Sequence, residues 1–159
     1  MTATNHALTG AAIALSVKSP VLAIPLAFVS HFLLDAIPHY NPPKITKDVF
    51  TNHFDAWSKK MQYRSFRFIY WTDMLLLAAI LIVVFLLDIS TASVWTVFFS
   101  CVAAVAPDFV GGILYLLRIK KVDLFTRFHI WFQWMERPWG IYVELIWFIL
   151  MLLLLVILI

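Results

Sequence analysis

The sequence predicts an all-α integral membrane protein with a short N-terminal helical hairpin, three transmembrane helices and an amphipathic helix in the membrane interface. Two observations lead to this fold class. First, 63% of the 159 residues are hydrophobic and only 13% are charged, whereas soluble proteins contain about 25% charged residues. Second, the chain contains several apolar runs of about 20 residues, the length that spans a bilayer. Too few polar side chains are present to cover the surface of a water-soluble globule.

Three segments are expected to cross the membrane, within a single domain that covers residues 1–159. The expected spans are 68–87, 93–117 and 141–159. The middle span contains Pro107 and Asp108. We interpret these residues as a kink and not as the end of the helix, because apolar residues continue on both sides.

The first 39 residues differ, because their two apolar segments are short and are separated by Lys18, Ser19 and Pro20. Serine before proline is a helix start signal, and Pro38 places the end of the second helix near Ile37. The first helix would be only about 18–20 Å long. Such a hairpin either re-enters the membrane from one side or packs inside the bundle, and the sequence leaves both alternatives open.

Two polar connections, 40–67 and 118–140, contain eleven of the twelve Lys and Arg residues. The second connection is also rich in Trp and Phe, as expected for a helix in the interface. The positive-inside rule predicts that both connections face the cytoplasm. We therefore expect a multi-pass protein of the inner (cytoplasmic) membrane, surrounded by lipid. The net charge of +3 follows from this topology, so no nucleic-acid partner is expected.

Ionisable residues inside the expected helices are candidates for a functional site, since a charge at the centre of the hydrocarbon costs at least about 2.5–3.5 kcal/mol. Asp35, Asp73, Asp108 and Glu144 are predicted to lie at a similar depth near the cytoplasmic side. Two interpretations of these acids stay open. Each acid pairs with a nearby cation or stays protonated, or several of them bind a divalent metal ion.

His31 and Asp35 give the strongest indication of a metal site, because residues four positions apart lie on one face of a helix. His39 would follow on the same stripe, so that three ligands are stacked along the second helix. Imidazole and carboxylate groups suit Zn²⁺ first, with Mn²⁺ or Fe²⁺ as alternatives.

Four short motifs together resemble small bacterial inner-membrane proteins that are classed as metal-dependent hydrolases. They are Asn-His-Ala-Leu-Thr-Gly at 5–10, Ser-His-Phe-Leu-Leu-Asp-Ala-Ile-Pro-His at 30–39, Pro-Asp at 107–108 and Phe-His at 128–129. The second motif also looks like the His-Phe-x-x-Asp signature of zinc-dependent phospholipase C and P1-type nucleases. The resemblance implies a metal site with the ligands His6, His31, Asp35, His39 and Asp108.

The chemistry that this resemblance implies is hydrolysis of a phosphoester, such as a lipid headgroup, at the cytoplasmic membrane surface. Asp73 and His129 are the expected proton carriers or further ligands. The cations expected to bind the substrate are Lys59, Lys60, Arg64, Lys120 and Lys121. Two other functions stay open: a proton or metal-ion carrier that uses the intramembrane carboxylates, and a structural membrane protein that binds partners through residues 125–139.

We predict that a cysteine introduced at Lys60 or Lys121, in a Cys101→Ala background, is protected from an impermeant thiol reagent in intact cells. Both positions lie in the cation-rich connections, which should face the cytoplasm. Labelling is compared in intact and permeabilised cells, and Ser90→Cys in the cation-free loop is the control that should react from outside. Labelling of Lys60→Cys or Lys121→Cys in intact cells would contradict the topology.

Overall fold

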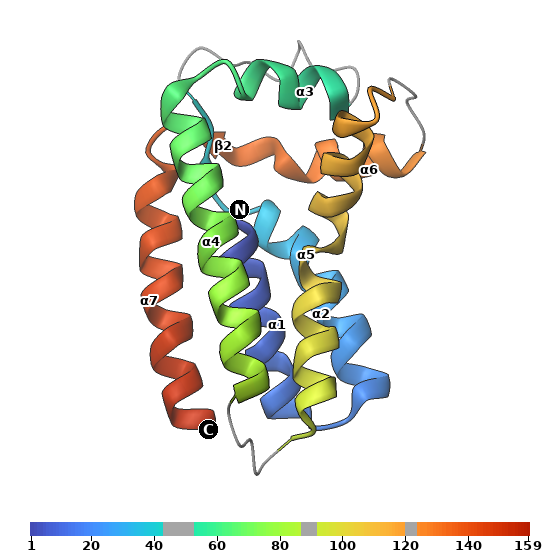
Figure 1. Cartoon of the computed structure of the whole chain (residues 1–159), viewed down its shortest axis with the longest axis vertical. Helices are drawn as coiled ribbons and strands as arrows, with labels where there is room; N and C mark the ends of the chain where they lie inside the picture. The colour runs from blue at the N-terminus through green and yellow to red at the C-terminus, as the bar shows by residue number, and fades with distance from the viewer. Residues whose placement is uncertain (43–52, 87–91, 120–123) are drawn as a thin grey trace.

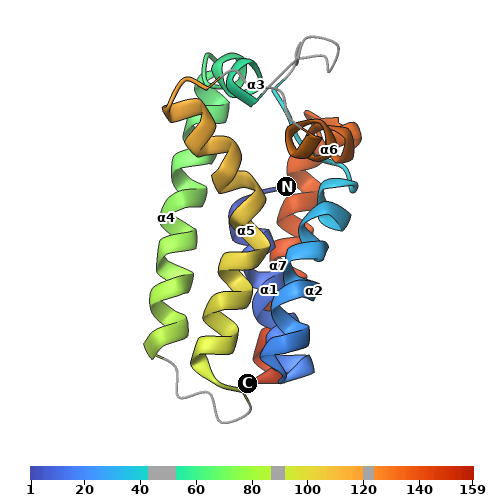
Figure 2. The ribbon, with the colours of Figure 1, turned by 90° about the vertical axis from the view of Figure 1, so that its right-hand side faces the viewer.

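The computed structural model describes residues 1–42, 53–86, 92–119 and 124–159, and most of them are helical. Five helices run along one axis and two shorter helices cross one end of the bundle (Figures 1 and 2). The predicted all-α class is confirmed. The long helices are α1 (Ala3–Val17), α2 (Pro20–Asp35), α4 (Arg64–Leu86), α5 (Val94–Leu116) and α7 (Gly140–Leu158). The crossing helices are α3 (His53–Lys60) and α6 (Leu124–Phe132).

Helices α4, α5 and α7 are each long and apolar enough to cross a membrane. They correspond to the three expected spans. Helix α4 begins at Arg64, four residues before the expected start of the first span, and its first turn is polar. Helix α5 continues through Pro107, as predicted. The outward faces of these helices are apolar, as the exposed side chains of Leu75 and Val156 illustrate.

Helix α1 lies inside the bundle, where it packs against α2, α4, α5 and α7. The first helix of the hairpin is therefore packed inside the bundle, whereas α2 exposes apolar side chains such as Val21 and Leu33 at its surface. Small residues explain the close packing, since Ala7, Gly10, Ala11 and Ala14 let neighbouring backbones approach. A Cβ atom at Gly10 would lie only 2.5 Å from the carbonyl oxygen of Ser100 in α5.

The polar connection 40–67 contains helix α3, which the sequence analysis did not predict. Eight residues are too few to show a clear apolar period, but the charges suit a helix. Asp55 lies in the first turn and Lys59 and Lys60 lie in the last, where each sign is favourable to the helix dipole. The second connection contains helix α6, followed by a 3₁₀ helix (Gln133–Met135).

Two very short strands close the polar end of the bundle. Strand β1 (His39–Tyr40) pairs in parallel with β2 (Glu136–Arg137), so that His39 lies beside Glu136. Gly140 is required next to this ladder, because a Cβ atom there would overlap the backbone of His39. The ladder ties the end of α2 to the start of α7. Two-residue strands give no alternating pattern, which is why the sequence did not reveal them.

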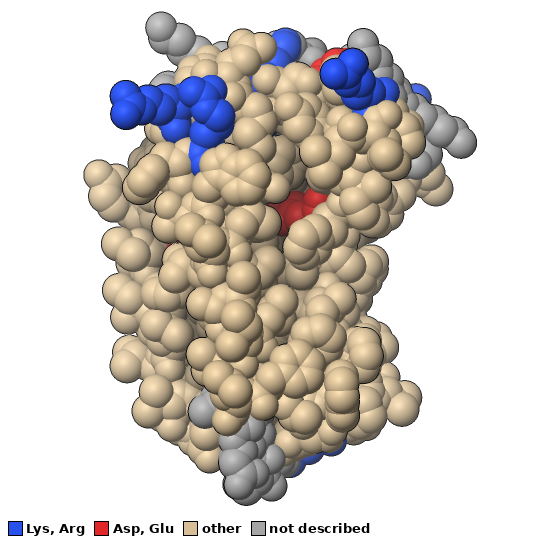
Figure 3. Space-filling model, in the orientation of Figure 1, with Lys and Arg blue, Asp and Glu red and all other residues tan. Residues whose placement is uncertain are grey.

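Charged side chains are concentrated at the same polar end. Figure 3 shows Lys and Arg side chains around the end that carries α3 and α6, and a broad uncharged band below them. The described part of the chain thus reproduces the one-sided clustering of cations seen in the sequence.

We predict that Gly10→Ala destabilises the fold by about 1–3 kcal/mol, the usual cost of overpacking. The added methyl group would collide with the backbone of Ser100. Gly112→Ala is the matched control, because a Cβ atom there meets no heavy atom within 4 Å. Thermal unfolding in detergent measures both variants. Equal melting temperatures for Gly10→Ala and the parent protein would contradict the predicted close contact.

Candidate metal centre

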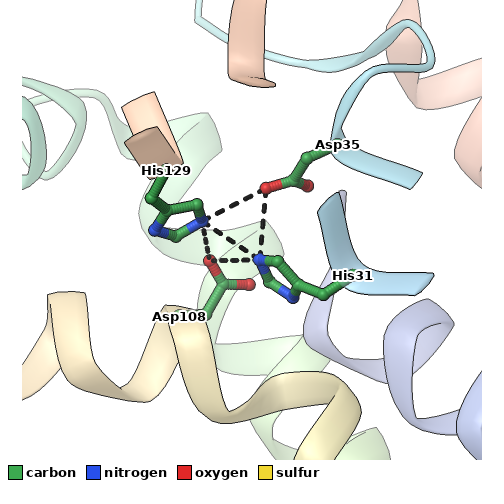
Figure 4. Close-up of side chains that lie close together, drawn as sticks. All are labelled: His31, Asp35, Asp108 and His129. Atoms are coloured by element: carbon green, nitrogen blue, oxygen red, sulfur yellow. Dashed lines mark hydrogen bonds and ion pairs between the residues drawn. The ribbon is translucent and has the colours of Figure 1, made fainter. Parts of the chain in front are cut away.

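Four side chains converge where α2, α5 and α6 meet near the polar end. His31 and Asp35 come from α2, Asp108 from α5 and His129 from α6. One donor atom of each residue lies within 4.8 Å of the others, and Figure 4 shows the side chains pointing toward a common centre. We call these four residues the His–Asp group. The group could hold a metal ion.

The distances between the donor atoms suit a coordination shell. His31 Nε2 and His129 Nε2 are 3.0 Å apart, and each lies 3.3 Å from Asp35 Oδ2. Asp108 Oδ1 is 3.9 Å from His31 Nε2 and 3.6 Å from His129 Nε2. Ligands bound at about 2.0–2.1 Å to a tetrahedral Zn²⁺ ion are about 3.3 Å from one another. The observed distances bracket this value.

Hydrogen bonds orient the ligands of the His–Asp group. His31 Nδ1 lies 2.8 Å from the carbonyl oxygen of Ala104. A carbonyl can only accept, so Nδ1 donates its proton. In the neutral ring Nε2 then carries the lone pair, which is directed at the centre. On the other side, Gln133 donates from its side-chain amide to Asp35 Oδ2 at 3.2 Å. Gln133 was missed in the sequence, although its spacing of four from His129 places both on one helical face.

His6 lies directly beside the His–Asp group. Its Nε2 faces the other oxygens of the two carboxylates, at 3.3 Å from Asp35 Oδ1 and 4.0 Å from Asp108 Oδ2. Its ring stacks on His31 with the centroids 4.0 Å apart. Among the described residues, neither ring nitrogen makes a hydrogen bond, although the side chain is fully buried. His6 therefore lies next to the group but is not one of its four residues. The α-amino group of Met1 also contacts Asp35 Oδ1, at 2.5 Å.

His39 is not part of the group, which corrects the expected stack of three ligands. Helix α2 ends at Asp35, so the helical stripe does not extend to His39, which lies in β1. Its Nε2 is 3.5 Å from Glu136 Oε1, and Lys60 Nζ donates to the same oxygen at 2.5 Å. Burial would raise the pKa of Glu136, but the charges of Lys60 and His39 outweigh this effect and lower its pKa to about 2.

Asp73 and Glu144 hold the N-terminus of α1. Asp73 accepts hydrogen bonds from the backbone N–H groups of Ala3 at 2.8 Å and Thr4 at 3.0 Å. Glu144 accepts one from the backbone N–H of Thr2 at 3.1 Å. The first N–H groups of a helix need acceptors, and α1 has no side-chain cap of its own. Carboxylates from α4 and α7 therefore cap this helix. Asp35, Asp73, Asp108 and Glu144 thus lie at one end of the bundle, but they serve two different purposes.

A cavity of about 520 Å³ adjoins the His–Asp group. Asp108, His129 and Asp73 contribute to its wall, and aromatic side chains from α3, α4 and α5 form much of the remainder. Of the cations expected to bind substrate, Lys60 lines this cavity, Lys59 and Arg64 do not, and Lys120 and Lys121 lie outside the described residues. Arg67, which was not selected, also lines it.

Comparisons with models of known protein families, with curated protein sequences and with solved structures find no match to this chain. The resemblance noted in the sequence therefore stays a prediction. The functional argument depends on the geometry of the His–Asp group and of the adjoining cavity.

We predict that Asp73→Ala lowers the melting temperature, because it removes the acceptor of two backbone N–H groups at the buried end of α1. An unsatisfied buried donor costs about 1–3 kcal/mol. Asp73→Asn keeps an acceptor oxygen and should lower the melting temperature less. Thermal unfolding in detergent decides the point, and unchanged stability of Asp73→Ala would show that the carboxylate does not cap α1.

Proposed function

We propose that this protein is a metal-dependent hydrolase of the inner membrane that cleaves a phosphoester at the cytoplasmic side. The observation that carries the proposal is the His–Asp group, whose donor atoms have the spacing of a coordination shell beside a cavity whose wall includes Lys60 and Arg67 as well as carboxylates. Two imidazoles and two carboxylates favour Zn²⁺, with Mn²⁺ or Fe²⁺ as alternatives.

A metal ion would also account for the charge balance of the group. Asp35 is fully buried and the side chain of Asp108 is 24% exposed, and two anions this close repel each other. Asp35 has the α-amino group of Met1 as a partner. Among the described residues, Asp108 has only histidines within ion-pair distance. A divalent ion would neutralise both carboxylates at once.

A divalent ion bound here would supply a Lewis acid and a water molecule whose pKa is lowered toward about 7. The proposed reaction consumes one water molecule. The water oxygen forms a bond to phosphorus, the bond between phosphorus and the ester oxygen breaks, and the alcohol leaves with a proton that the water has lost. Lys60 and Arg67 line the cavity, where their positive charges attract the phosphate group.

The one-sided position of the group favours an enzyme over an ion carrier. A carrier needs polar or ionisable side chains along a path through the whole membrane. Toward the opposite end of the bundle, the helices contain no Asp, Glu or His. The segments concerned are 7–17, 20–30, 74–86, 94–104 and 145–158.

We predict that Asp35→Asn lowers the metal content of the purified protein at least about tenfold, as changes at metal sites commonly do. The amide keeps the size of the side chain but removes the anionic ligand. Elemental analysis of protein reloaded with Zn²⁺ or Mn²⁺ measures the effect. Asp73→Asn is the matched control, because Asp73 is a carboxylate at the same end of the bundle but outside the His–Asp group. A parent protein that retains no metal after reloading would end the proposal.

The same samples test hydrolysis. The metal-loaded parent protein should release product from at least one member of a panel of phospholipids, lipid-linked phosphates, nucleotides and p-nitrophenyl phosphate. Chelation should abolish the activity and added Zn²⁺ or Mn²⁺ should restore it. If metal-loaded protein hydrolyses no member of the panel, the proposed hydrolase activity is wrong, and ion flux in vesicles becomes the next measurement.

A further inference from the structure

The cavity beside the His–Asp group reaches the surface on the side of the bundle. Its wall combines residues of α4 and α5, and Figure 3 shows a hollow on this face with acidic atoms at its bottom. Asp108 has the most exposed side chain of the group, at 24%, whereas His31 and Asp35 are fully buried. The site is therefore reached from the side between two helices that are long and apolar enough to cross a membrane.

The rim of this side opening is apolar. Trp71 of α4 is 62% exposed, and Phe109, Ile113 and Leu116 of α5 are 46%, 52% and 76% exposed. All four residues line the cavity. Trp71 lies three residues inside the expected span 68–87, and Phe109 lies eight residues before the end of the expected span 93–117. In the proposed topology the rim therefore extends from the membrane edge, at Leu116, into the hydrocarbon. An apolar rim at this depth faces lipid chains and not water.

The inner end of the cavity is polar and carries charges of both signs, since Asp73, Glu136 and Glu144 line it as well. Lys60 from α3 and Arg67 from α4 contribute to the wall, as do Asp108 and His129 of the His–Asp group. Arg67 also donates hydrogen bonds to the carbonyl oxygens of Met61 and Gln62, which fix its guanidinium at the end of α3. The cavity therefore has an apolar entrance and a polar interior, which would suit a phosphate group once a divalent ion offsets the carboxylates.

Gly112 leaves open space in the wall between these two ends. It lines the cavity, and a Cβ atom at this position would meet no heavy atom within 4 Å. Ile113 and Leu116, on the same stretch of α5, supply apolar surface beside it. This stretch can therefore accommodate a chain of methylene groups that runs from the rim toward the polar interior.

We propose that the substrate is a phosphate-bearing lipid that enters sideways from the bilayer between α4 and α5. Its phosphate lies near Lys60 and Arg67, next to the His–Asp group, and its hydrocarbon chain leaves past Gly112 and the apolar rim. This inference rests on the proposed phosphoester hydrolase and names its substrate class. It favours a lipid over a soluble phosphoester, because a soluble ester gains nothing from an entrance of exposed Trp, Phe, Ile and Leu side chains.

Photo-crosslinking in vesicles tests the lipid site without depending on turnover. The probe is a phosphonate analogue of phosphatidic acid with a diazirine in one acyl chain, whose P–C bond is not hydrolysed. The comparison probe is diacylglycerol with the same chain. Metal-loaded protein should be labelled within 69–74 and 109–116 at least fivefold more by the phosphonate than by diacylglycerol. The exposed residues Leu153, Val156 and Ile157 of α7 report ordinary contact with the bilayer and should react equally with both. Equal labelling of the rim by both probes would overturn the inference.

Gly112→Leu provides the matched variant, because its side chain fills the open space at this position. Labelling of the rim by the phosphonate should fall to the level seen with diacylglycerol, while Gly112→Ala keeps most of it. Metal content and labelling of α7 report that the variant is folded. Phosphonate labelling of Gly112→Leu at the parent level would contradict the proposed path.

The two proposals fail in different ways. Selective labelling of the rim without hydrolysis of any ester would support the lipid site and refute the hydrolase. Hydrolysis of p-nitrophenyl phosphate or nucleotides without selective labelling would support the hydrolase and overturn the lipid entrance.

Discussion

Four carboxylates gathered at one end of an apolar bundle are the constraint on which the rest of the structure depends. Each needs partners, because an isolated charge is costly in such surroundings. Asp73 and Glu144 obtain theirs from backbone N–H groups at the start of α1. Asp35 and Asp108 face imidazoles instead. The N-terminus of the buried helix α1 and the candidate metal centre thus both supply partners for buried carboxylates at the same end of the bundle.

The position of α1 links the carboxylates that cap it to the His–Asp group. Its small residues let it occupy the middle of the bundle, so its N-terminus points at the polar end where the acids lie. His6, one turn further along, then comes within 3.3 Å of Asp35. Packing of alanine and glycine in the core therefore decides which polar groups meet several residues away. The feature that brings them together is the shape of α1 and not an attraction between the groups themselves.

Much of the fold could be predicted from the sequence because hydrophobicity determines it. The three long apolar helices, the central proline in α5 and the Ser19–Pro20 helix start all follow from local patterns. Within the site, the pairing of His31 with Asp35 could be predicted, because residues four positions apart lie on one face of a helix. The position of His39 could not be predicted, because it depends on where α2 ends and on strand pairing with Glu136, 97 residues further along the chain. Such contacts between distant segments leave no trace in periodicity.

The residues of the His–Asp group come from three separated segments of the chain, so the group is completed late in synthesis. His31 and His129 are 98 positions apart, and α6 follows α5 in the chain. A growing chain that has been synthesised as far as α5 already contains Asp35 and Asp108 but lacks the last imidazole. The complete set of ligands exists only after α6 has emerged and folded back across α2. Tight retention of an ion would therefore mark the completed protein, and truncated or misassembled chains would carry uncompensated acids that a quality-control protease can recognise by their instability.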